Sequence, residues 1–90
     1  MEIDEISSAV VGESIRIHRE LGPGLLESVY EKTLMAALVR RGMKVESQVP
    51  ISIKYDGMVI DAAFRLDLFV EKRLVVEIKA VEQLTKLHAR

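Results

Sequence analysis

The residues with the clearest potential for chemistry lie near the end of the chain, where Asp67 precedes the triplet Glu77, Ile78 and Lys79. If the two segments pair as antiparallel strands around a turn at residues 71–73, Asp67 lies directly opposite Glu77. Two facing carboxylates repel each other, but a divalent cation between them would turn the repulsion into ligation, because hard cations bind carboxylate oxygens. Lys79 would lie on the same face. This pattern of an Asp followed by Glu-x-Lys is what a metal-dependent phosphodiester-cleaving site needs.

The same pattern also fits a solvated sheet face, in which basic side chains neutralise the acids across the strands. Glu77 and Lys79 favour the metal site, because they interrupt the otherwise apolar segment 74–80, and a charge in a mostly buried strand is costly unless it is paired or ligated. Glu46 would lie across from Asp67 on the other side if the preceding hairpin is regular. A bulge between residues 43 and 54 would remove Glu46 from the row, so it ranks below the other two acids.

Two helices are expected before these strands. Apolar residues at helical spacing predict helices over residues 4–20 and 26–41, separated by the Gly-Pro-Gly break within 21–25 and ended by Gly42. Glu27 lies in the first turn of the second helix, where a carboxylate is favourable next to the positive end of the helix dipole even without a function. The functional alternative makes Glu27 a further metal ligand, delivered from a helix above the sheet.

The second half of the chain reads as a β-meander. Apolar and polar residues alternate over 43–55, which predicts a strand with one buried face. Asp56-Gly57 is typical of a two-residue type I′ hairpin turn, and the strand that follows, over 58–70, places its apolar side on the same face. A third strand is expected over 74–80 and a last helix over 82–90.

Composition limits the range of functions. The 90 residues, 49% hydrophobic and 30% charged, fit one small domain over 1–90. The net charge of -1 argues against a dedicated nucleic-acid-coating protein, which would be plainly basic. The lack of cysteine excludes disulfides and thiolate metal sites. There is no apolar run long enough to span a membrane and no basic signal segment at the N-terminus, so we expect a soluble, cytoplasmic protein.

Residues 18–30, His-Arg-Glu-Leu-Gly-Pro-Gly-Leu-Leu-Glu-Ser-Val-Tyr, closely resemble the signature of the GxxExxY proteins. These form a small prokaryotic family assigned to the PD-(D/E)XK nuclease superfamily. Arg-Leu-Asp-Leu at 65–68 and Val-Glu-Ile-Lys-Ala at 76–80 resemble the catalytic hairpin of that superfamily. The resemblance covers nearly the whole chain, and the first signature is the more specific of the two.

The resemblance implies an α/β (α+β) fold of the restriction-endonuclease type, in which helices flank a three-stranded antiparallel meander in the order α-α-β-β-β-α. It implies a Mg²⁺- or Mn²⁺-dependent endo- or exonuclease that acts on nucleic acid. Asp67 and Glu77 would be metal ligands, together with the main-chain carbonyl of Ile78. Lys79 would contact the attacking water or the scissile phosphate, and Glu27 would be the accessory acid.

Members of the family continue the last helix and add a fourth strand, whereas this sequence stops at Arg90. We therefore expect a domain that is incomplete at its C-terminus, with an unpaired edge on the third strand and a homodimer that covers exposed apolar surface. Two alternatives to the nuclease stay open. One is a catalytically inactive module of the same fold that binds nucleic acid or protein, and the other is an oligomerising domain whose core a second subunit completes.

Overall fold

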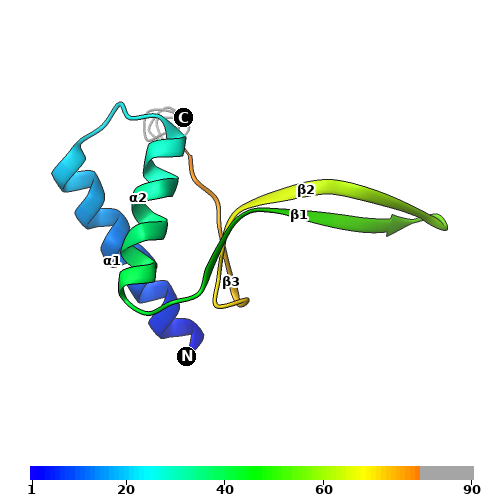
Figure 1. Cartoon of the computed structure of the whole chain (residues 1–90), viewed down its shortest axis with the longest axis horizontal. Coiled ribbons are helices and arrows are strands. Elements are labelled where there is room, and N and C mark those ends of the chain that lie inside the picture. The colour runs from blue at the N-terminus through cyan, green and yellow to red at the C-terminus, as the bar shows by residue number, and fades with distance from the viewer. Residues whose placement is uncertain (80–90) are drawn as a thin grey trace, which may run out of the picture.

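The computed structural model describes residues 1–79, which form two α-helices and one three-stranded antiparallel sheet with strand order β1-β2-β3. The elements are α1 (Ile3–Leu21), α2 (Glu27–Arg40), β1 (Val45–Tyr55), β2 (Met58–Val70) and β3 (Leu74–Val76). Figure 1 shows the two helices side by side, the base of the sheet next to them, and the β1–β2 hairpin extending away from both. The predicted order of two helices followed by a three-stranded meander is confirmed. The helix expected over 82–90 lies outside the described residues.

One small hydrophobic core joins both helices to the base of the sheet. Its buried members are Ile6, Ala9, Val10, Ile17, Leu34, Ala37, Leu38, Met43, Leu68 and Val70. The helical members recur at intervals of three and four residues, so each helix buries one face. The two buried strand members both lie at the base of β2, and Val45 at the base of β1 packs against this core. Neither helix combines the length and the apolar character needed to cross a membrane.

A Schellman motif ends α2 and turns the chain towards β1. The N–H of Gly42 donates to the carbonyl of Val39 at 2.9 Å, and the N–H of Met43 donates to the carbonyl of Leu38 at 3.1 Å. Gly42 has a φ of 88°, a left-handed conformation that glycine adopts without steric cost. The predicted stop at Gly42 is confirmed, and the motif returns Met43 to the same core as Leu38.

The turn between β1 and β2 forms as predicted. Asp56 and Gly57 have φ values of 51° and 76°, and a type I′ turn requires positive φ at both central residues. Tyr55 pairs with Met58 across the turn. The right-handed twist of a type I′ turn matches that of the strands, so the two strands continue as a long ribbon beyond the helices.

The register of this hairpin changes part-way along it. Ile53 pairs with Ile60, but Ile51 pairs with Phe64, so β2 advances four residues while β1 advances two. The additional residues form a bulge that contains Ala62, whose φ of 53° is left-handed. Because the shift is an even number of residues, the alternation of inner and outer side chains is unchanged, and the apolar face stays continuous along the hairpin.

Glu13, on α1, is the buried charged residue of the described part of the chain, with 9% of its surface exposed. Its carboxylate accepts hydrogen bonds from Arg16 Nε at 2.9 Å and from Arg41 Nε at 2.8 Å. These hydrogen bonds hold the pKa of Glu13 below its ordinary value, although burial alone would raise it. Arg41 is the C-cap of α2, so this carboxylate ties the middle of α1 to the end of α2.

We expect the Glu13→Gln variant to be less stable than the wild type at pH 7, because it replaces an ion pair with a weaker neutral contact. A lowered pKa in the folded state gives stabilisation that is complete above the ordinary value of 4.5 and is lost as pH falls through the lowered one. The difference in urea unfolding midpoint, followed by circular dichroism, should therefore shrink below pH 4.5. Glu20→Gln, which affects an exposed ion pair with Arg16, is the control. An equal difference in urea unfolding midpoint at pH 7 and below pH 4.5 would contradict this role.

Candidate functional site

Asp67 and Glu77 lie just beyond the end of the pairing between β2 and β3. β2 and β3 pair in the expected register, with Leu68 opposite Val76 at the end of the pairing. Extended by one residue, the same register would place Asp67 across from Glu77. Because side chains alternate and Leu68 is fully buried in the core, Asp67 points to the outer face of the sheet, away from the helices.

A hydrogen bond from the main chain to a side chain fixes this arrangement. The N–H of Ile78 donates to Asp67 Oδ2 at 2.7 Å. The carboxylate thus replaces the main-chain acceptor that a continuing strand would use, and β3 ends at Val76. The predicted third strand over 74–80 is therefore wrong for residues 77–79, and Ala80 lies outside the described residues. The hydrogen bond nevertheless holds these residues against β2.

The segment after β3 is held from two sides. The side chain of Ile78 is half-buried and packs against the hydrophobic core, while its N–H is bound by Asp67. Asp67 is also half-buried, and Glu77 and Lys79 on either side of Ile78 are exposed. Within residues 1–79 no ion pair neutralises Asp67 or Glu77. The cross-strand pairing that a purely solvated face would provide is not what this part of the chain shows.

Glu46 does not join these acids. The bulge in β2 pairs Glu46 with Phe69 rather than with Asp67, so the predicted row of three carboxylates is wrong. The corrected register instead brings Gln48 to the level of Asp67. Gln48 has a φ of 52°, and its side-chain amide donates to Glu31 of α2 at 2.7 Å. This amide therefore ties β1 to α2 and does not lie beside the candidate acids.

Glu27 is the first residue of α2, where the positive end of the helix dipole stabilises its negative charge. Glu27 is exposed. Among the residues that the structure describes, no three His, Asp or Glu side chains gather as a metal-binding group. Glu27 is thus not assembled there with Asp67 and Glu77 into one set, and its role as an accessory acid stays a prediction.

Tyr30 has a structural role that its place in the sequence does not reveal. Its hydroxyl donates to the carbonyl of Gly22 at 2.5 Å. Gly22 is the C-cap of α1 and has a φ of 77°. The hydrogen bond fastens the connection between the helices to the second turn of α2. It explains why a tyrosine three residues after Glu27 accompanies the Gly-Pro-Gly sequence.

A groove of about 600 Å³ lies between the two helices and the segment after β3. Glu77 and Lys79 line it, together with His18 and Arg19 of α1 and with Tyr30. The walls are otherwise mainly apolar. Nothing in the spacing of His18 along the sequence shows that α1 lies beside the segment that carries Lys79. The groove brings basic side chains from two separate parts of the chain next to the candidate acid at 77.

The sequence model of the PD-(D/E)XK nuclease superfamily matches residues 4–90. This chain belongs to the PD-(D/E)XK nuclease superfamily. The match covers almost the whole chain, and the two helices with a three-stranded antiparallel sheet are consistent with the restriction-endonuclease-like core of that superfamily. No curated protein and no solved structure matches the chain significantly.

The donor atoms at this site fit a hard divalent cation. Asp67 and Glu77 supply carboxylate oxygens, and Ile78 supplies a main-chain carbonyl oxygen next to them. Mg²⁺ prefers oxygen ligands, and it is usually held by one or two carboxylates together with waters and substrate phosphates. A full cage of protein side chains is therefore not needed. The hydrogen bond from Ile78 engages Oδ2 of Asp67, and no other hydrogen bond within residues 1–79 occupies Oδ1, which can therefore bind a ligand.

We expect the Asp67→Ala variant to expose the Ile78 amide. Losing a hydrogen bond to a charged acceptor costs about 1.5 to 3 kcal/mol, so amide exchange at Ile78 should accelerate roughly tenfold or more. Asp67→Asn keeps an oxygen acceptor and should retain most of the protection. Hydrogen–deuterium exchange followed by NMR measures both, with the amide of Val75 as an internal reference. Unchanged exchange at Ile78 in Asp67→Ala would show that the carboxylate does not hold this segment.

Proposed function

We propose that this protein is a metal-dependent nuclease that cleaves phosphodiester bonds in nucleic acid. The observation that carries the proposal is the hydrogen bond from the N–H of Ile78 to Asp67, in a chain of the PD-(D/E)XK nuclease superfamily. This bond holds the segment of Glu77 and Lys79, which line a groove, next to Asp67 of β2. The residue types and their order match those that the superfamily resemblance implies for cleavage.

In this proposal Asp67, Glu77 and the carbonyl of Ile78 hold Mg²⁺ or Mn²⁺. When bound, such an ion polarises the phosphodiester and lowers the pKa of a coordinated water. Lys79 donates hydrogen bonds to the scissile phosphate or to the attacking water, and its ammonium group stabilises the developing negative charge. Glu27 serves as the accessory acid from the start of α2.

The groove supports nucleic acid as the partner despite the net charge of -1. His18 and Arg19 line the same groove as Lys79, and they come from α1 on the other side of it. A basic side chain on each side would contact phosphates flanking the one to be cleaved, because phosphate contacts position a nucleic acid whatever its sequence. The local arrangement of charge matters here more than the total.

Within the superfamily, we infer that the chain is a GxxExxY protein. Gly24, Glu27 and Tyr30 supply the signature, and the Tyr30 hydrogen bond to Gly22 provides a structural reason for the tyrosine. We also propose that the protein acts in the cytoplasm, which accords with a chain that has no cysteine, and that it forms a homodimer. The dimer is supported by apolar side chains that lie exposed on the β1–β2 hairpin.

A catalytically inactive module of the same fold is the second candidate, and the near-neutral net charge favours it. Such a protein would keep the groove and bind nucleic acid or protein without cleaving it. Its binding would not depend on a divalent cation, and it would tolerate the loss of Lys79.

The wild type should cleave single- or double-stranded DNA or RNA with Mg²⁺ or Mn²⁺ and should be inactive with EDTA. We expect Glu77→Gln and Lys79→Ala each to lower the cleavage rate by about a hundredfold or more, because each removes charge that acts on the transition state. Gel assays on labelled substrates measure the rates. The matched controls are Glu46→Gln, which lies outside the corrected row, and Lys54→Ala on the distal hairpin, and both should retain wild-type rates.

Circular dichroism would show whether the two site variants keep the wild-type fold. A wild type that cleaves none of these substrates with either metal would rule out the nuclease. If the wild type cleaves nothing but binds nucleic acid in EDTA, and the Lys79→Ala variant binds equally well, the protein is the catalytically inactive binding module.

A further inference from the structure

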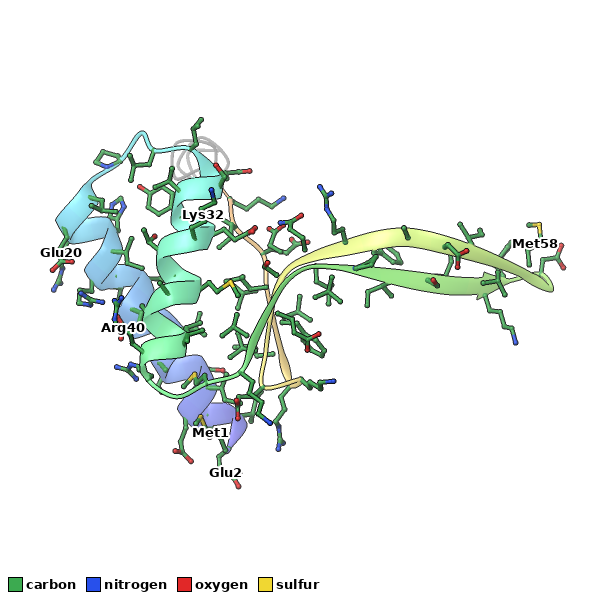
Figure 2. All side chains as sticks on the ribbon, in the orientation of Figure 1. Met1, Glu2, Glu20, Lys32, Arg40 and Met58 are labelled. Carbon is green, nitrogen blue, oxygen red and sulfur yellow. The ribbon has the colours of Figure 1, made fainter. Side chains whose placement is uncertain are left out.

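The outer part of the β1–β2 hairpin, residues 51–64, carries a row of large apolar side chains outside the core. We call this segment the hairpin arm. Its apolar face consists of Ile51, Ile53 and Tyr55 on β1 and Met58, Ile60 and Phe64 on β2. Tyr55 is 69% exposed and Phe64 is 60% exposed. Figure 2 shows Met58 at the far end of the arm, well away from the helices.

Cross-strand pairing places these six side chains on one face. The three pairs are Ile51 with Phe64, Ile53 with Ile60, and Tyr55 with Met58. The opposite face is largely polar, as shown by the hydrogen bond from Ser52 to Asp61 at 3.2 Å. A two-stranded hairpin with one apolar face is marginally stable in water unless that face is packed against something.

The apolar face of the arm is a continuation of the core-forming face of β2. Leu68 is fully buried, Leu66 is half-buried and Phe64 is exposed, at successive positions on one side of the strand. At the base of the hairpin, α1 and α2 cover this side. Further out, nothing within residues 1–79 covers it. The even-numbered register shift keeps the face continuous, so the arm presents a core-like surface that residues 1–79 leave uncovered.

The charges of the arm argue against nucleic acid as the occupant. Between residues 51 and 64 there is one basic side chain, Lys54, and there are two acidic ones, Asp56 and Asp61. A surface that binds phosphates would carry an excess of basic side chains. The surface that covers this face must instead be apolar and of matching shape.

We propose that the apolar face of the hairpin arm packs against the same face of a second copy of this chain, with the two arms antiparallel. A two-fold axis through the middle of the row, at Ile53 and Ile60, places the tip of each arm over the base of the other. Tyr55 and Met58 of one copy then meet the surface formed by Phe64 and Ile51 of the partner copy. Such an interface is self-complementary, as two-fold symmetry requires.

The size of the surface agrees with a reversible dimer. Two copies stacked in this way would bury on the order of 1,000 Å², because the two aromatic side chains on each face are 69% and 60% exposed, a fully buried aromatic side chain covers roughly 150 to 250 Å², and the aliphatic side chains supply the rest. About 1,000 Å² is the lower limit for a specific interface, so we expect association in the micromolar range. The inference rests on the proposed homodimer and not on the proposed nuclease activity.

Sedimentation velocity through the micromolar range tests the arm directly. We expect the wild type to shift from monomer to dimer with concentration, and Phe64→Ser to raise the dimer dissociation constant tenfold or more. Val59→Ser is the matched control, because Val59 is 62% exposed but lies on the opposite face, paired with Lys54. It should change the constant by less than about threefold. Circular dichroism of both variants checks that the fold is kept.

Cross-linking gives a second readout, since the natural chain has no cysteine. Ile60→Cys, near the centre of the apolar face, should form dimers efficiently with a short bis-maleimide reagent, and Val59→Cys should not. A wild type that stays monomeric would overturn both the homodimer and the arm interface. A wild-type dimer that tolerates Phe64→Ser and cross-links equally through both cysteines would overturn the arm interface alone. Neither outcome bears on cleavage, which the gel assays measure separately.

Discussion

The hydrogen bond between the N–H of Ile78 and the Asp67 carboxylate determines how the candidate site is built. Without it, the chain after β3 would either continue pairing with β2 through main-chain groups or separate from it. With it, pairing stops at Val76, yet the next residues stay next to β2. One carboxylate therefore acts as an end signal for the strand and as an anchor for Glu77 and Lys79. The same carboxylate is the first proposed metal ligand, so one side chain both anchors the segment after β3 and would bind the cation.

The opposite wall of the groove is α1, and the rest of the fold holds it in place through a small core and a few hydrogen bonds and ion pairs. Glu13 joins α1 to the end of α2 through Arg16 and Arg41, and the Schellman motif at Gly42 sets the direction in which the chain leaves α2. The hydrogen bond from Gln48 to Glu31 joins β1 to α2. The core is small and involves only the base of the sheet together with the helices. Each of these polar contacts is therefore needed to position α1 opposite the segment of Lys79.

Periodicity and turn chemistry are local properties, and they predicted the helices, the Asp56-Gly57 turn and the pairing of β2 with β3. The bulge around Ala62 could not be predicted, because no glycine or proline marks it and the register of a long hairpin depends on what each face packs against. That bulge alone removes Glu46 from the acids. The early end of β3 was missed for a related reason. Its apolar pattern continues past Val76, while the competing acceptor, Asp67, lies on another strand.

The residues of the candidate site also fall into two groups: those that local sequence predicts and those whose position depends on tertiary packing. Asp67, Glu77 and Lys79 were predictable because residue type and a short connection bring them together. His18 and Arg19 were not, since their place along the groove depends on how α1 packs. The direct test of the central claim is calorimetric titration with Mn²⁺. The account predicts binding to the wild type, its loss in Asp67→Asn and Glu77→Gln with the fold intact, and unchanged binding in Glu46→Gln. Equal affinity in all four proteins, or no binding to the wild type, would contradict it.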